Sequence, residues 1–173
     1  MNKKITIPAS FQHPLFFEQG EIELAEKQSF EEVLGGIPFF YDFMLEAGEG
    51  EITQPWEEQE IYVPKLFNYW KDNKDSIGEY FKKRDRIGAL RPMILSLGHF
   101  ISALFWTNGT RVQSLFHLKE EIKKLQYKPI NTEGRVTFLL EQPNQYHSYI
   151  QLGELYQELT KIYHKMLIMK KRG

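Results

Sequence analysis

The sequence predicts an all-α protein, namely a single-domain helical bundle of about six or seven helices over residues 29–173. An irregular N-terminal arm, residues 1–28, is expected to dock on this body. The length of 173 residues suits one domain with its own core. The stretch 92–106 is apolar nearly all round, as in a helix that is buried on most sides. Near the end of the chain, apolar residues recur with the 3-4-3-4-3 spacing of a long bundle helix, at Tyr149, Leu152, Tyr156, Leu159, Tyr163 and Met166.

The start of the chain predicts the arm and a first short helix. Pro8 and Pro14 prevent an early helix, and the apolar cluster 15–17 indicates that the arm packs against the body. Ser29 is a suitable N-cap for the first helix, and Glu32 completes a capping box with it.

Prolines are expected to divide the middle of the chain. Pro38 opens a second short helix, and an acidic loop then leads to Pro64, where another helix begins. A separate helix runs from about Ser76 to the basic residues 82–84. The apolar stretch 92–106 shows no alternation with period two, so a helix is favoured there over a pair of strands.

Three further elements complete the predicted bundle. Ser114 is expected to cap a helix whose apolar residues recur at helical spacing up to Leu125. A short element over 136–140 follows, and it ends near Pro143. The long final helix carries the apolar stripe that begins at Tyr149.

The composition excludes several classes of protein. There is no cysteine, which excludes disulfides, thiolate zinc sites and thiol nucleophiles. The basic start lacks the apolar run of a signal peptide, and no stretch reaches the ~18 apolar residues of a membrane span. We therefore expect a cytoplasmic protein that does not bind a membrane.

The charge is distributed unevenly along the chain. Residues 1–60 carry three basic and thirteen acidic side chains, whereas residues 61–173 carry nineteen basic and ten acidic ones. Such asymmetry marks either a charged binding surface or an acidic part that packs across a basic part. We favour the second interpretation and expect the two parts to lie against each other.

No residue pattern predicts a catalytic, cofactor-binding or metal site. A metal site needs at least three convergent ligands, and the pair His117 and Glu121 supplies only two. No nucleophile elbow or phosphate-binding loop is present, so no cofactor is expected and an enzyme of unknown type ranks third among the functions. His99 lies in the apolar stretch, and we expect it to be buried and free of metal. Its imidazole would bond to a backbone carbonyl, Ser96 or Ser102.

Basic residues close to aromatic ones can follow a phosphate backbone and stack on bases. The candidate polyanion-binding residues are Lys82, Lys83, Arg84, Arg86, Arg91 and Arg111. The competing interpretation is that these are ordinary surface charges, because the isoelectric point of about 6.5 is below that of a dedicated nucleic-acid domain. The sequence leaves open whether they form one contiguous face.

Aromatic residues make up 14% of the chain, and many of them stand in short segments bounded by proline. Interfaces favour such residues, and the candidate partner-binding aromatics are Phe16, Phe17, Phe39, Phe40 and Trp56. The competing interpretation is that they fill the core, because aromatic side chains bury large areas.

Three strings resemble those of the YpoC-like proteins: HPLFF at 13–17, RPM at 91–93 before an apolar helix that ends in FWTNG, and the tyrosine-rich last helix. The resemblance implies a small bacterial cytosolic protein, often encoded near replication and base-excision-repair genes, without catalytic residues to transfer. The predicted function is a non-enzymatic interaction or adaptor module that binds a protein partner. The alternative is a nucleic-acid-binding accessory protein of repair or replication that uses the basic C-terminal half. The partner and the oligomeric state are left open.

Overall fold

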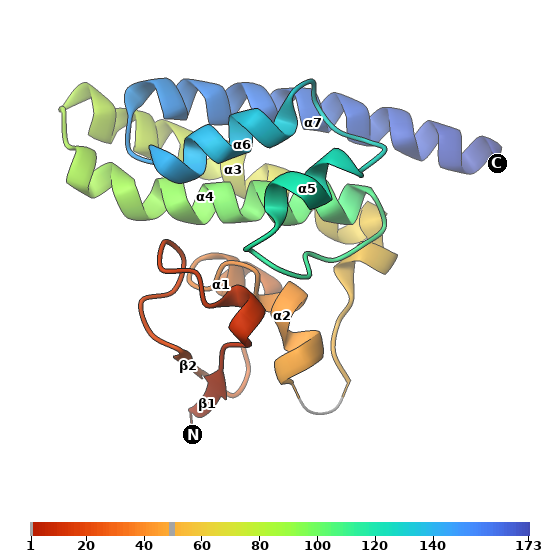
Figure 1. Ribbon diagram of the computed structural model, residues 1–173, viewed down its shortest axis with the longest axis horizontal. Helices are drawn as coiled ribbons and strands as arrows, with labels where there is room; N and C mark the ends of the chain where they lie inside the picture. Colours follow the sequence, from red (N-terminus) through yellow and green to blue (C-terminus); the bar gives the residue numbers. More distant parts are fainter. Residues whose placement is uncertain (1, 49–50) are drawn as a thin grey trace.

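Three long helices form the centre of the protein, which is described here by a computed structural model covering residues 2–48 and 51–173. They are α3 (Gln59–Lys82), α4 (Arg86–Thr107) and α7 (Tyr146–Arg172). α3 runs antiparallel to both α4 and α7, and the shorter α5 (Leu118–Lys123) and α6 (Thr132–Glu141) lie beside them (Figure 1). With the two short helices α1 (Phe30–Leu34) and α2 (Phe40–Ala47), the described residues form seven α-helices, so the all-α prediction is confirmed.

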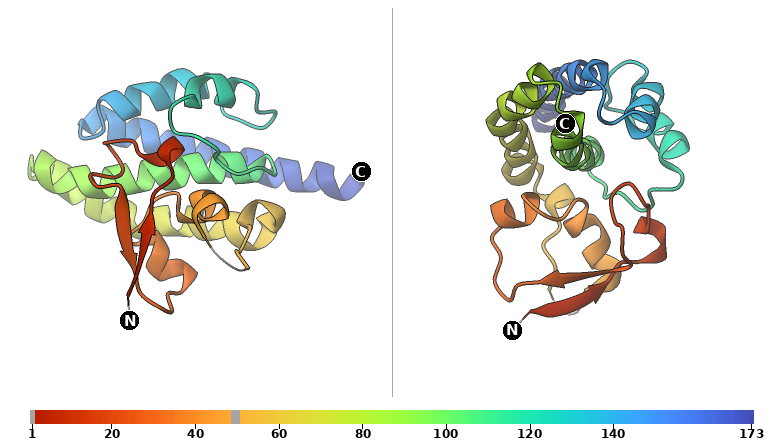
Figure 2. Two further views of the ribbon diagram at one scale, coloured as in Figure 1. Left: turned by 60° about the horizontal axis from the view of Figure 1, so that its bottom comes forward. Right: turned by 90° about the vertical axis from the view of Figure 1, so that its left-hand side faces the viewer.

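The N-terminal part, residues 2–47, lies under this helical layer (Figure 2, right). Its arm is not irregular throughout, because β1 (Lys3–Thr6) and β2 (Glu21–Leu24) pair as a two-stranded antiparallel sheet. In this pairing Ile5 lies opposite Ile22. The strands are four residues each and one side of the pair remains exposed, so the sequence carries no clear alternating signal for them.

Apolar side chains of the arm pack against the rest of the chain. Ile7 and Phe11 are fully buried, and Phe11 lies against the rings of Phe39 and Phe43 at centroid distances of 6.1 and 5.9 Å. Burying each such side chain contributes roughly 1.5–3 kcal/mol. The arm is therefore part of the core.

Two short helices connect the arm to α3. The predicted N-cap of α1 (Phe30–Leu34) is confirmed, because Ser29 Oγ accepts the Glu32 amide at 3.1 Å, while the Glu32 carboxylate accepts the Ser29 hydroxyl at 3.2 Å and not the Ser29 amide of a full capping box. α2 (Phe40–Ala47) follows Phe39, whose backbone is in the left-handed region with φ 61°. The buried Phe39 ring contacts Phe16 edge-on at 4.8 Å, and this packing offsets the unfavourable backbone conformation.

α3 is one continuous helix, so the predicted division at Ser76 is wrong, as is the predicted start at Pro64. Pro64 stands in the second turn, where its missing N–H removes a single bond to the preceding turn. A buried stripe that includes Val63, Trp70 and Ile77 runs through both predicted pieces. Continuous burial along one face outweighs the local effect of the proline.

α4 is the buried central helix that the apolar stretch predicted, and it begins earlier, at Arg86. Asp85 caps it by accepting the Gly88 amide at 2.8 Å. Among the described residues it is the one helix long and apolar enough to cross a membrane, and 72% of its most apolar window is buried inside the protein. A core helix passes the same length and composition test.

The last three helices differ from the predictions at their starts. Ser114 does not cap α5, because its Oγ accepts the Phe116 amide in the preceding turn and the N-cap of α5 is His117. α6 begins at Thr132, four residues before the predicted element over 136–140, and α7 begins at Tyr146, three residues before the predicted stripe. The stripe itself is confirmed, since Leu152, Tyr156, Leu159, Tyr163 and Met166 are all buried.

The acidic and basic parts of the chain lie against each other, as the charge distribution predicted. Two ion pairs join them, Lys65–Glu31 at 2.8 Å and Arg111–Glu46 at 3.0 Å. Exposed ion pairs contribute only about 0–1 kcal/mol each, so the apolar contacts supply most of the attraction.

Candidate functional site

His99 lies in α4 at the boundary with the N-terminal part and is buried as predicted. Its Nε2 is 2.7 Å from the Leu34 carbonyl oxygen, and the Tyr69 ring meets it edge-on. Burial lowers the pKa of His99 to about 4, although the bond to Leu34 opposes the shift. The imidazole is therefore neutral at neutral pH. Nowhere in residues 2–48 and 51–173 do three or more His, Asp or Glu side chains gather in a group that could hold a metal ion.

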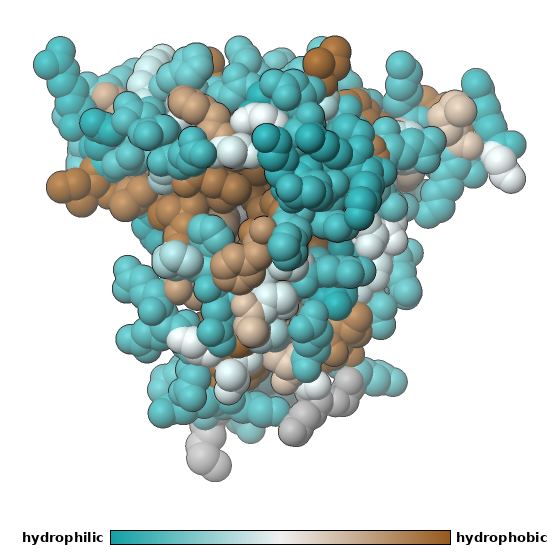
Figure 3. All heavy atoms as spheres, viewed as in Figure 1, coloured by the Kyte–Doolittle hydropathy of each residue, from teal (hydrophilic) through white to brown (hydrophobic). Residues whose placement is uncertain are grey.

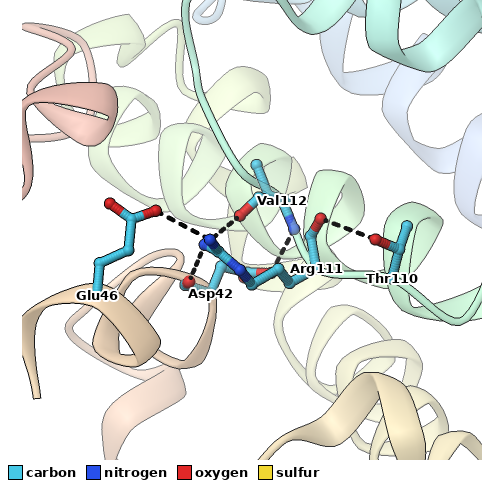
Figure 4. Close-up of polar contacts among 5 residues, drawn as sticks. All are labelled: Asp42, Glu46, Thr110, Arg111 and Val112. Carbon is cyan, nitrogen blue, oxygen red and sulfur yellow. Dashed lines mark hydrogen bonds and ion pairs between the residues drawn. The ribbon is translucent and has the colours of Figure 1, made fainter.

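A second buried polar group, the Asp42 cluster, stands near the C-terminal end of α4 (Figure 4). The Asp42 carboxylate accepts hydrogen bonds from Ser102 Oγ at 2.7 Å, Trp106 Nε1 at 2.9 Å and the Val112 amide at 2.9 Å. Burial raises the pKa of Asp42 to about 6, and these three bonds limit the rise. The cluster joins α2, α4 and the segment that follows α4, which is a structural role.

Arg111 belongs to the Asp42 cluster rather than to a basic surface. Its guanidinium donates to the backbone carbonyls of Asp42 and Val112 and pairs with Glu46 (Figure 4). α4 has 22 residues, which corresponds to a length of about 33 Å. Arg111 follows one end of this helix and Arg86 starts the other, so the structure separates these two candidate residues.

Gln59 completes the polar bonding at this end of α4. Its side-chain amide donates to the carbonyls of Trp106 and Thr107, at 2.7 and 2.9 Å, and accepts a bond from Lys170 Nζ at 2.9 Å. The last carbonyls of a helix lack partners inside the helix. Gln59 supplies a partner to both carbonyls here, and the Trp106 carbonyl also accepts the Gly109 amide at 2.9 Å. Neither Gln59 nor Asp42 was a sequence candidate. The one signal in the sequence is that Asp42 is the single acidic residue of the aromatic string 37–43.

At the other end of α4, the turn 82–86 brings together four of the candidate cations, Lys82, Lys83, Arg84 and Arg86, all of them exposed. Lys82 pairs with Glu79, and Arg86 Nε donates to the Asn144 carbonyl. Arg91 is one turn further along α4 and donates to the Gly36 carbonyl. We call residues 82–86 the basic turn.

Beside the basic turn lies an apolar groove of about 500 Å³ between the arm and the N-terminal half of α4. We call it the arm groove. Figure 3 shows hydrophobic side chains gathered at the level of α4, above the N-terminal part, where the surface is hollowed. The lining residues are Leu15, Phe16, Phe17, Glu18, Gln19, Glu21, Ile22, Gly36, Ile37, Ile87, Leu90, Arg91 and Ile94.

Ile87 is the most exposed large hydrophobic side chain of the described residues, at 89%. It is the second residue of α4, and it is not a sequence candidate, because it lies outside the apolar stretch 92–106. A single exposed aliphatic side chain is ordinary on a protein surface, but this one borders a groove with other apolar walls.

The candidate partner-binding aromatics divide into buried and accessible ones. Phe16, Phe39 and Trp56 are 3%, 2% and 8% exposed and belong to the core. Phe17 and Phe40 are partly exposed, and Phe17 lines the arm groove. Only these last two rings are accessible to a partner in this conformation.

A second groove, of about 520 Å³, runs between α3 and α7. Its floor holds the stacked rings of Trp70 and Tyr156, which are 6% and 3% exposed. Its rim carries exposed charged side chains such as Lys71 and Lys161. The rings stack on each other and are nearly buried, and the accessible apolar surface of this groove is at least as large as that of the arm groove.

The fold and these surfaces define a helical protein with one continuous core, a rigid polar junction at one end of α4 and an apolar groove at the other. The chain belongs to the YpoC-like family, since the family model described as YpoC-like protein matches residues 60–171. It is also 35% identical, over 157 residues, to "Uncharacterized protein YpoC" of Bacillus subtilis (strain 168). That alignment covers 90% of this chain and 94% of the relative. No solved structure matches the chain significantly. The family resemblance of the sequence strings is thus confirmed.

Proposed function

We propose that the protein is a non-enzymatic interaction module that holds an amphipathic segment of a partner protein in the arm groove. The exposure of Ile87 at the edge of this groove carries the proposal. Covering this side chain would contribute roughly 1.5–3 kcal/mol to binding, before the cost of association is subtracted. Leu90, Phe17 and Ile22 are partly exposed in the same groove and add to the apolar surface.

The charges of the groove favour a basic partner segment. Glu18 and Glu21 lie on the arm side of the groove, both are exposed, and neither has an ion-pair partner within residues 2–48 and 51–173. Arg91, on the α4 side, donates to the Gly36 carbonyl and keeps its positive charge, but the two carboxylates outnumber it in the lining of the groove. A helix with an apolar face and flanking lysines or arginines fits this arrangement, in the manner of other helix-in-groove complexes.

The test uses two synthetic helical peptides with the same leucine face, one flanked by lysines and the other by glutamates. Fluorescence anisotropy measures their binding to the full chain. We expect the basic peptide to bind more tightly and the Ile87→Glu variant to bind it at least about tenfold more weakly, because a charge then enters the apolar contact. Replacing both Glu18 and Glu21 with lysine should shift the preference toward the acidic peptide.

Ile130→Glu is the matched control, because Ile130 is 87% exposed but does not line the groove. This variant should bind the basic peptide like the wild type. Absence of binding by the basic peptide, or an equal loss in the two glutamate variants, contradicts the proposal.

A further inference from the structure

Three described residues other than glycine have a backbone in the left-handed region: Phe39, Arg84 and Asn131. This conformation crowds the side chain of an L-amino acid, and glycine is the usual residue there. Phe39 is compensated by its buried ring, and asparagine tolerates the conformation better than most residues. Arg84, with φ 57°, has neither compensation, because it is exposed and its side chain forms no hydrogen bond or ion pair with the described residues.

The surrounding turn explains why Arg84 has this backbone conformation. The Asp85 amide donates to the Tyr80 carbonyl at 2.8 Å, and the Arg84 amide donates to the Phe81 carbonyl at 3.0 Å. These two bonds form a Schellman motif that ends α3, and Arg84 occupies the position at which glycine is most frequent. The tight reversal into α4 requires a left-handed residue but gives no structural reason for an arginine.

The neighbours of Arg84 supply a reason. Lys82, Lys83 and Arg86 are exposed in the same turn, at the convex tip of the hairpin that α3 and α4 form. The two nearby acids are engaged locally, since Asp85 caps α4 and Glu79 pairs with Lys82. The basic turn therefore projects net positive charge into solvent, with Lys83 and Arg84 unpaired among the described residues.

We infer that the basic turn binds the phosphate backbone of nucleic acid and that Arg84 contacts a phosphate directly, at a cost in stability. Guanidinium groups bind phosphate in a fixed, two-pronged geometry that glycine cannot provide. A narrow convex tip can approach phosphates on both sides of a groove, whereas a flat membrane surface would meet only part of it. Electrostatic contact of this kind carries little sequence preference.

Arg84→Gly separates this inference from a purely structural role of the residue. The substitution relieves the backbone crowding, so we expect the melting temperature of the full chain to rise by about 2–4 °C. It also removes a phosphate contact. We expect the affinity for a fluorescein-labelled duplex of mixed sequence to fall about threefold to tenfold, and the salt slope of binding to decrease by about one.

Three control variants and a vesicle measurement complete the experiment. Arg84→Lys retains the charge and the crowding, so it should change neither melting temperature nor salt slope, while Lys83→Gln should weaken DNA binding without raising the melting temperature. Lys119→Gln, on the exposed face of α5, should change neither. If Arg84→Gly raises the melting temperature and leaves DNA affinity unchanged, the inference is overturned. It is also overturned if vesicles of equal phosphatidylglycerol and phosphatidylcholine bind the protein and DNA does not.

Discussion

The two ends of α4 differ in their surroundings: polar groups are buried and hydrogen-bonded at one end, and side chains are exposed to solvent at the other. At the C-terminal end, the carbonyls of Trp106 and Thr107 receive bonds from Gln59, and the Asp42 carboxylate receives three more bonds. At the N-terminal end, Ile87 is 89% exposed and the cations of the basic turn project into solvent. The bonds that stabilise the fold are therefore concentrated at the C-terminal end of α4, whereas the surface that is free for binding is concentrated at its N-terminal end.

The largest effect on stability is expected at the C-terminal end of α4. Asp42→Ala removes the acceptor for Ser102 Oγ, Trp106 Nε1 and the Val112 amide, which are buried donors without other partners among residues 2–48 and 51–173. Each unsatisfied buried donor costs about 1–3 kcal/mol, so we expect the free energy of unfolding to fall by roughly 3–5 kcal/mol. Urea unfolding followed by circular dichroism measures this loss.

Glu46→Ala is the comparison for that experiment. Glu46 pairs with Arg111 in the same cluster, but its side chain is 39% exposed, so its loss should cost less than about 1 kcal/mol. Similar losses for the two variants would show that the buried bonds of Asp42 do not hold this end of α4 in place.

The next largest effect is expected in the pH dependence of stability, to which Asp42 and His99 contribute. The folded protein keeps a proton on Asp42 up to about pH 6, whereas the unfolded chain loses it near 3.8, so stability falls as the pH rises through this range. His99 acts in the opposite sense. Its folded pKa of about 4 lies below the unfolded value of 6.5, so stability falls as the pH is lowered from 6.5 to 4. The two contributions largely cancel in the wild type.

Single substitutions should expose each contribution. With Asp42→Asn the His99 contribution is no longer opposed by that of Asp42, and the melting temperature should rise with pH between 4 and 6.5 relative to the wild type. With His99→Gln, where the Asp42 contribution is no longer opposed by that of His99, it should fall relative to the wild type over the same interval. Melting curves at several pH values measure both slopes, and parallel profiles for all three proteins would contradict the assignment.

The smallest effect on stability is expected at the N-terminal end of α4. Ile87→Glu places a charge where the side chain is already in water and at the first turn of α4, where a negative charge is favourable. The free energy of unfolding should therefore change by less than about 0.5 kcal/mol. A loss of more than 1 kcal/mol, measured by urea unfolding, would mean that Ile87 packs in the core and that the contrast between the two ends is false.

The sequence predicted those parts of the fold that depend on long periodic patterns. The stripe of α7 and the all-round apolar character of α4 are such patterns, because burial repeats over several turns. Local signals were less reliable, as Pro64 shows, since a proline near the start of a helix is outweighed by packing along its full length. The β1–β2 pair escaped prediction because four-residue strands bury too few side chains to alternate visibly.

The candidate site was less predictable than the fold. The basic turn could be predicted because its residues are adjacent in the sequence. The arm groove could not, since Phe17 and Ile87 are 70 positions apart and meet only in three dimensions. Arg111 was grouped with the other cations by residue type alone, and its bonds to residues of α2 became visible only in the structure.

The position of α4 in the chain has a consequence for synthesis on the ribosome. Its apolar surface is covered on one side by the N-terminal part and on another by α7, which ends at Arg172. The N-terminal cover leaves the ribosome before α4, but the cover formed by α7 leaves it after α4. A nascent chain that stops before α7 therefore exposes a helix long and apolar enough for a membrane. Such truncated products are expected to aggregate or to engage chaperones, because they lack α7.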